Sequence, residues 1–136
     1  IASSQSLAAT PNIAAWWVLG HMLNWIDEQG GVKLLGLRQK RRATRFYDLL
    51  SRCSGISFEQ NKPWRSTQNI VFQFKDSRLM DSFLLNAEQE GFVGLRNHKS
   101  RQGIRLNLYH GVSDEMTEKL YTFLEYQLSK QGVLYG

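Results

Sequence analysis

The alternation of apolar and polar residues is clearest near the C-terminal end of the chain, between positions 104 and 109. Its two faces are Ile104, Leu106 and Leu108 on one side and Arg105, Asn107 and Tyr109 on the other. A period of two is typical of a strand with one buried face. We expect Gly103, which has no side chain, to act as the hinge through which the preceding loop enters this strand.

The first apolar segment predicts a helix from Thr10 to about Gln29. Thr10 suits the N-cap and Pro11 the first helical position, and Gly30-Gly31 would end the helix. This helix would have almost no polar face. Its apolar residues are Ile13, Ala14, Ala15, Trp16, Trp17, Val18, Leu19, Met22, Leu23, Trp25 and Ile26. A helix apolar on all sides is expected to be covered on more than one side, so we expect its outer face to meet another domain or subunit.

Three further helices and three further short strands are predicted along the rest of the chain. They are helix 32–53, strands 56–59 and 69–74, a helix capped by Asp76 or Ser77 that stops at Gly91, a short strand 92–95, and helix 113–131. We expect a turn at Asn61-Lys62-Pro63. The residues expected to face inward are Leu34, Leu35, Phe46, Leu49, Leu50, Leu79, Phe83, Leu84, Ala87, Met116, Leu120, Phe123, Leu124 and Leu128. This order predicts an α+β fold with a small, mostly antiparallel sheet and helices packed on one face.

Composition places the chain among ordinary globular domains. It has 136 residues, of which 42% are hydrophobic and 21% are charged. No apolar run approaches the roughly 18 residues of a membrane span, and the first residues lack the features of a signal peptide. The single cysteine, Cys53, has no metal-ligand neighbours and is interpreted as an inert thiol of a cytoplasmic protein. Because the chain opens on Ile1, we expect it to be a piece of a longer protein.

A net charge of +5 favours an anionic partner. Five cations are crowded into the middle of the second predicted helix: Arg38, Lys40, Arg41, Arg42 and Arg45. They are compatible with a small basic module that binds nucleic acid. They point in several directions around the helix, however, and no recognition motif accompanies them, which favours a solvated face.

The residues that point most directly to chemistry lie between Leu95 and His110. His98 and Lys99 lie in a short basic loop, and Arg105 follows at the start of the predicted strand. This is a suitable arrangement for a dianion, with a planar guanidinium available for a carboxylate. The helix start at Thr10 is a second possible anion site, although these residues alone favour ordinary capping of a buried helix. No catalytic or metal-binding motif is present, and no catalytic residue or metal ligand is predicted.

Four segments occur in an order and spacing typical of one enzyme family. They are S-L-A-A-T-P at 6–11 with A-W-W at 15–17, W-I at 25–26 with G-G-V at 30–32, R-S-T-Q-N-I-V-F at 65–72, and the stretch 95–109. The last resembles the family pattern L-K-G-H-R-x-x-G-G-x-R-A-S-x-Y-N. Over nearly its whole length the chain thus resembles the C-terminal small domain of phosphoserine aminotransferase, a pyridoxal-phosphate enzyme of fold type I.

This resemblance implies roles for four residues. His98 and Lys99 would hold the substrate phosphate, and Arg105 would bind its α-carboxylate. Thr10 would reach the cofactor phosphate of the partner subunit in a homodimer. The substrates implied are phosphoserine or 3-phosphohydroxypyruvate and glutamate or 2-oxoglutarate, with no membrane or nucleic-acid partner.

The resemblance also implies a division of the chain. Residues 1–12 would be a lead-in from a large pyridoxal-phosphate domain, and residues 13–136 would be the small domain. The family's Schiff-base lysine belongs to the large domain, so the isolated chain is expected to be inactive and not to bind the cofactor covalently. The sequence departs from the family pattern at four positions: Ala9, Lys99, Gln102 and His110.

Overall fold

A computed structural model of the chain describes residues 11–58, 61–97 and 102–134. The chain divides into two compact units, residues 1–36 and 37–136. The division predicted at residue 12, between a lead-in and the small domain, stays a prediction. In the part of the chain that the structure describes, no helix combines the length and apolar character needed to cross a membrane.

The first unit contains helix α1 (Ile13–Glu28). Its N-cap is Asn12, whose side-chain oxygen accepts the Ala15 amide at 3.1 Å. The prediction that Pro11 occupies the first helical position is therefore wrong: asparagine is as good a cap as threonine, and this one lies two residues further on. Thr10 lies outside the described residues. Gly30, with φ +85°, and Gly31, with φ +78°, follow the helix end as expected.

Helix α1 buries none of its residues within this chain. Seven of its large apolar side chains are each about half to two-thirds exposed: Ile13, Trp16, Trp17, Val18, Leu19, Met22 and Leu23. Because so much apolar surface is costly to leave in water, the expectation that another domain or subunit covers this helix stays a prediction.

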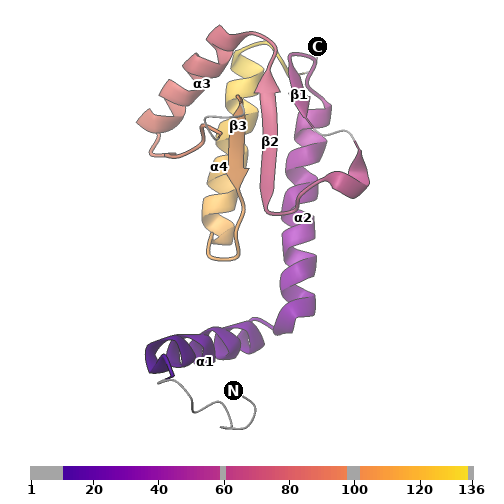
Figure 1. The fold of residues 1–136 in the computed structure, drawn as a ribbon. Helices are drawn as coiled ribbons and strands as arrows, with labels where there is room; N and C mark the ends of the chain where they lie inside the picture. The colour runs from indigo at the N-terminus through magenta and orange to yellow at the C-terminus, as the bar shows by residue number, and fades with distance from the viewer. Residues whose placement is uncertain (1–10, 59–60, 98–101, 135–136) are drawn as a thin grey trace. The chain divides into compact units, whose positions relative to one another are not determined.

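The second unit is built on a three-stranded sheet of order β1-β2-β3, shown in Figure 1. The strands are β1 (Ile56–Phe58), β2 (Asn69–Phe74) and β3 (Ile104–Asn107), and both pairings are antiparallel. A 3-10 turn (Lys62–Trp64) lies between β1 and β2, where the sequence predicted a turn. In the β2–β3 register, Val71 is opposite Arg105 and Asn69 is opposite Asn107.

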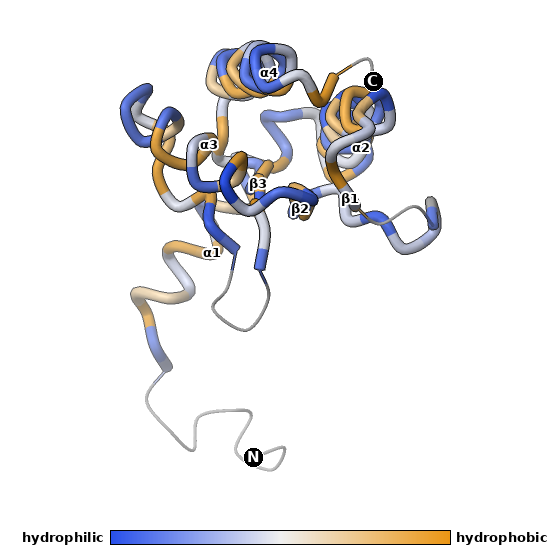
Figure 2. The backbone as a smooth tube through the Cα atoms, turned by 90° about the horizontal axis from the view of Figure 1, so that it is seen from above, coloured by the Kyte–Doolittle hydropathy of each residue, from blue (hydrophilic) through white to orange (hydrophobic). Residues whose placement is uncertain are grey.

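Three helices cover one face of this sheet. They are α2 (Gly31–Ser51), which the unit boundary crosses, α3 (Ser77–Gln89) and α4 (Asp114–Lys130). Seen from above, α2 and α4 lie end-on on one side of the strands (Figure 2). Asp76 caps α3 and Ser113 caps α4, as the sequence indicated. The predicted α+β fold, a small antiparallel sheet with helices on one face, is confirmed.

A cluster of aromatic rings joins the helices to the sheet. Phe83 of α3 is fully buried, and its ring lies 6.2 Å from that of Phe72, 5.6 Å from that of Phe74 and 5.5 Å from that of Phe123. Phe72 and Phe74 point inward from β2, and Phe123 comes from α4. These contacts bury the inward face of the sheet. In the part of the second unit that the structure describes, no helix covers the other face.

Three sequence predictions about individual positions are wrong. Leu34 and Met116 are about half exposed, because the buried stripes of their helices pass through Leu35 and Thr117 instead. No strand forms at 92–95; the pairing with β3 comes one residue later, as an isolated bridge between Arg96 and Ile104.

Candidate functional site

The open face of the sheet carries the polar residues of β2 and β3. On β3, Ile104 and Leu106 enter the core, while Arg105 and Asn107 lie on the opposite face and are half-buried. On β2 the same face carries Asn69, Val71 and Gln73. The strict alternation of a strand thus places the guanidinium predicted to bind a carboxylate on the one face that no helix of the second unit covers.

Arg105 is held by its backbone and not by its side chain. Its amide donates to the Leu95 carbonyl at 2.7 Å, and Val71 lies opposite in the ladder. Among the described residues, no hydrogen bond or ion pair involves the guanidinium, and its Nε is buried without a partner. A cation left without an acceptor in this way, on an open face, is available for an external anion.

The loop before β3 is closed at its base. The Asn97 amide donates to the Gly103 carbonyl at 2.9 Å, next to the bridge between Arg96 and Ile104. Gly103 has φ +121°, and a Cβ there would lie 2.6 Å from the Phe72 carbonyl oxygen. The predicted hinge role of Gly103 is therefore confirmed, because both the backbone conformation and the close approach to β2 require glycine.

The predicted site residues His98 and Lys99 come between Asn97 and Gly103 in the sequence and are outside the described residues. Thr10 is also outside them. The expected proximity of His98 and Lys99 to Arg105 stays a prediction.

Two further polar side chains, those of Asn107 and Tyr109, accompany Arg105. The alternation in the sequence placed them on the same face but gave them no role. Asn107 has a buried Oδ1 without a partner. Tyr109 donates its hydroxyl to Asn69 Oδ1 at 3.0 Å, across the end of the β2–β3 ladder. The period of two had already grouped Arg105, Asn107 and Tyr109. The Asn69 contact had no signal in the sequence, because strand register is decided by packing.

The face fits the charged end of a substrate better than it fits the reactive end of pyridoxal phosphate. Neither β2 nor β3 carries a lysine that could bond to the cofactor's aldehyde or a carboxylate that could pair with its ring nitrogen. These strands offer amides and a guanidinium, which recognise carboxylate and phosphate oxygens. No step of the cofactor's chemistry is assigned to these residues.

Two of the five cations of the basic run on α2 pair with carboxylates of α4, and Arg52, just past the end of α2, pairs with a third. Arg42 binds Asp114 at 2.6 Å, Arg45 binds Glu118 at 2.7 Å, and Arg52 reaches Glu125 at 3.6 Å. The side chain of Arg42 is only 8% exposed, so the interpretation of this run as a solvated face is wrong for that residue. The two pairings offset the charges of Arg42 and Arg45 within this run.

The carboxylates of α4 respond to these arginines. The hydrogen bond from Arg42 lowers the pKa of Asp114, and the hydrogen bond from Arg45 lowers the pKa of Glu118. Both acids therefore stay ionised at neutral pH and serve to join two helices. They are not poised to exchange protons with a substrate.

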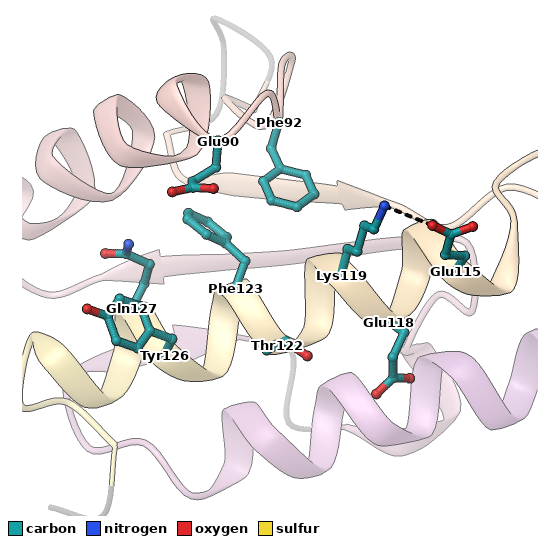
Figure 3. Close-up of a pocket in the computed structure, with 9 residues that line it drawn as sticks. All are labelled: Glu90, Phe92, Glu115, Glu118, Lys119, Thr122, Phe123, Tyr126 and Gln127. Carbon is teal, nitrogen blue, oxygen red and sulfur yellow. Dashed lines mark ion pairs between the residues drawn. The ribbon is translucent and has the colours of Figure 1, made fainter.

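A hollow of about 570 Å³ lies between the end of α3 and α4, as shown in Figure 3. Its floor includes Phe92 and Phe123, whose ring centroids are 5.0 Å apart. Of its three carboxylates, Glu115 is paired with Lys119 at 2.8 Å and Glu118 with Arg45. The hollow lies in the helical layer and shares no lining residue with the face that carries Arg105, so we do not assign the site to it.

Cys53 is half-buried near the end of α2. Its Sγ donates to the Leu49 carbonyl at 3.4 Å, and burial raises the pKa of the thiol. A raised pKa keeps the sulfur protonated at neutral pH, which agrees with its interpretation as an inert thiol.

The chain as a whole is similar to known proteins in sequence and in fold. No family model matches the chain. Its sequence is 30% identical over 123 residues to the phosphoserine aminotransferase of Coxiella burnetii. This match covers 90% of this chain and 34% of that enzyme. It is 32% identical over 124 residues to the phosphoserine aminotransferase of Pseudomonas syringae pv. syringae, covering 91% of this chain and 34% of that enzyme.

Solved structures give the same result. A phosphoserine aminotransferase from Bacillus circulans subsp. alkalophilus matches with a TM-score of 0.85 and 31% identity over 96% of this chain and 37% of that one. The pyridoxal-phosphate-bound enzyme from Trichomonas vaginalis matches with a TM-score of 0.78 and 22% identity over 91% of this chain and 36% of that one, a likeness of fold alone. The predicted resemblance is confirmed, and the chain spans about a third of the length of these relatives.

Proposed function

We propose that this chain is the C-terminal small domain of a phosphoserine aminotransferase and that Arg105 binds the α-carboxylate of its substrates. The observation that carries the proposal is the Arg105 guanidinium, which lies on the uncovered face of the sheet without any ion-pair partner among the described residues. The similarity to phosphoserine aminotransferases in sequence and fold supports it.

The whole enzyme would transfer an amino group between glutamate and 3-phosphohydroxypyruvate in the cytoplasm. Bound pyridoxal phosphate would supply the electron sink for that chemistry. The lysine that holds this cofactor would come from the large domain, and Thr10 would contact the cofactor phosphate across a homodimer.

The contribution of this chain is to bind and orient the substrate. Arg105 would hold the α-carboxylate, which glutamate and phosphoserine share, because a planar guanidinium matches a carboxylate with two parallel hydrogen bonds. His98 and Lys99 would hold the phosphate, which only phosphoserine has. Fixing both ends of the substrate places its amino-bearing carbon, and this positioning accounts for part of the rate of such a reaction.

The proposal is tested by changing Arg105 in the complete enzyme. We expect Arg105→Ala to lower kcat/KM for both glutamate and phosphoserine by roughly 50-fold or more, because a charge-assisted pair is lost. Arg78→Ala is the matched control, since the Arg78 side chain is 89% exposed and pairs only with its neighbour Asp76. An Arg105→Ala enzyme with unchanged kcat/KM for both substrates would contradict the proposal.

A second experiment uses the isolated chain. Mixed with pyridoxal phosphate, it is expected to show neither the absorbance of a cofactor bound covalently to lysine nor amino-group transfer. Either signal would contradict the division of roles between this chain and a large domain.

A further inference from the structure

Arg105 and Asn107 share an unusual feature: each has a buried polar atom without a partner. Four such side-chain atoms occur among the described residues, namely Gln39 Oε1, Arg105 Nε, Asn107 Oδ1 and Gln131 Oε1. The two glutamines use their amide nitrogens, which donate to backbone carbonyls. Arg105 and Asn107 make no such side-chain bond. Among the four atoms, Arg105 Nε is the one donor without a partner. Asn107 Oδ1 is the one acceptor whose side chain makes no other hydrogen bond among the described residues.

The two atoms lie on the same face of the same strand. Arg105 and Asn107 are two positions apart on β3, which separates their Cα atoms by roughly 6.7 Å. Both side chains are long enough to meet over that distance. Because both atoms are buried, water from the open face does not reach them, and their partners must come from within the protein or from a ligand.

The nearest other acceptors on this face differ from Asn107 Oδ1. Asn69 Oδ1 accepts from Tyr109, and the Gln73 amide nitrogen donates to the Gln102 carbonyl at 2.7 Å, which leaves Gln73 Oε1 as an acceptor on an exposed side chain of the neighbouring strand. Asn107 Oδ1 is buried and unpartnered on the same strand as Arg105, so it is the acceptor on this face that most needs a donor.

We infer that Asn107 is a positioning residue, whose Oδ1 accepts a hydrogen bond from Arg105 Nε after the two side chains rotate toward each other. This single bond satisfies both orphan atoms. It also fixes the plane of the guanidinium, so that its two terminal nitrogens are directed outward as a pair for a carboxylate. The consequence for substrate binding depends on the proposed function; the hydrogen bond itself does not.

The bond is tested by nuclear magnetic resonance on the 136-residue chain. The Nε–H signal of Arg105 is assigned by its loss in Arg105→Lys. We expect its exchange with water to be slower than that of exposed Arg41, and to become at least about tenfold faster in Asn107→Leu, which keeps the size of the side chain but removes the acceptor. An unchanged exchange rate in Asn107→Leu would overturn the inference.

A second variant guards against misfolding. If Asn107→Leu loses the circular dichroism of the native chain, Asn107→Asp decides the question, because it keeps the acceptor oxygen and strengthens it with charge. The Arg105 Nε proton should then resonate further downfield than in the native chain. No change in that resonance would overturn the inference.

Binding separates this inference from the proposed function. In the complete enzyme, with L-phosphoserine as the probe, we expect Asn107→Leu to weaken binding about tenfold and to leave the binding of inorganic phosphate unchanged, because only the carboxylate contact depends on Arg105. Equal affinity of the native enzyme and Asn107→Leu for L-phosphoserine would overturn the positioning role. If the native complete enzyme binds neither probe, the proposed function fails, while the exchange rates still decide whether Asn107 holds Arg105.

Discussion

Arg42 of α2 donates two hydrogen bonds to a single carboxylate oxygen of Asp114, which lies 72 residues further along the chain in the first turn of α4. Its Nε lies 2.9 Å and its Nη2 2.6 Å from Asp114 Oδ1, and its Nη1 donates to the Val112 carbonyl at 2.9 Å. One buried guanidinium thereby ties the middle of α2 to the N-terminal end of α4, where a carboxylate also suits the helix dipole.

Arg42→Gln is expected to destabilise the chain by about 2–3 kcal/mol, because hydrogen bonds to a charged group are lost and the Val112 carbonyl loses its donor. Urea unfolding followed by circular dichroism measures this change. Arg78→Gln is the control: its ion pair with Asp76 is local and exposed, and such pairs contribute about 0–1 kcal/mol. Equal effects of the two substitutions would contradict a structural role for Arg42.

Acid is expected to destabilise the chain through Asp114. The hydrogen bond from Arg42 lowers the pKa of Asp114 in the folded state below its ordinary value of 3.8. The ionised carboxylate therefore favours folding above pH 3.8, and this contribution is lost as the pH falls through the lower, folded-state pKa. Measuring the urea midpoint from pH 2 to pH 7 should show a smaller acid loss in Asp114→Asn than in the native chain.

Gly103→Ala is expected to destabilise the chain by about 2 kcal/mol or more, since a side chain at φ +121° is strained and its Cβ meets the Phe72 carbonyl oxygen at 2.6 Å. Gly111→Ala is the matched control, because nothing lies within 4 Å of a Cβ at that position. Thermal unfolding distinguishes them. If Gly103→Ala were as stable as Gly111→Ala, the hinge assigned to Gly103 would be wrong.

Phe83→Ala is expected to cost about 3–5 kcal/mol, because it removes the ring at the centre of the aromatic cluster and leaves a cavity. Leu85→Ala, on the same helix, is the control, since Leu85 is 58% exposed. Urea unfolding should show a large loss for the first substitution and at most a small one for the second. Comparable losses would mean that α3 is not held by its buried ring.

Lys99→Ala in the complete enzyme tests the part of the proposed site that lies outside the described residues. We expect KM to rise for phosphoserine and to stay nearly unchanged for glutamate, because only phosphoserine carries the phosphate that Lys99 would bind. Steady-state kinetics with both amino donors measures the difference. Equal losses for the two substrates would count against this assignment.

Much of the local structure could be predicted from the order of residues. Helix lengths followed from apolar periods and from caps such as Ser113, and β3 followed from its alternation, because these signals depend on neighbours in the chain. That same alternation placed Arg105, Asn107 and Tyr109 on one face, so the composition of the candidate site was present in the sequence together with its orientation relative to the core.

Only the tertiary structure decided which residues meet across the fold. The pairing of Arg42 with Asp114, the contact of Tyr109 with Asn69 and the orphan atoms of Arg105 and Asn107 depend on register and helix packing. These follow from how whole faces bury one another, and the sequence expresses them at no single position. The basic run on α2 shows this most clearly: read along the chain it was a charged surface, and in the fold two of its members, Arg42 and Arg45, join α2 to α4.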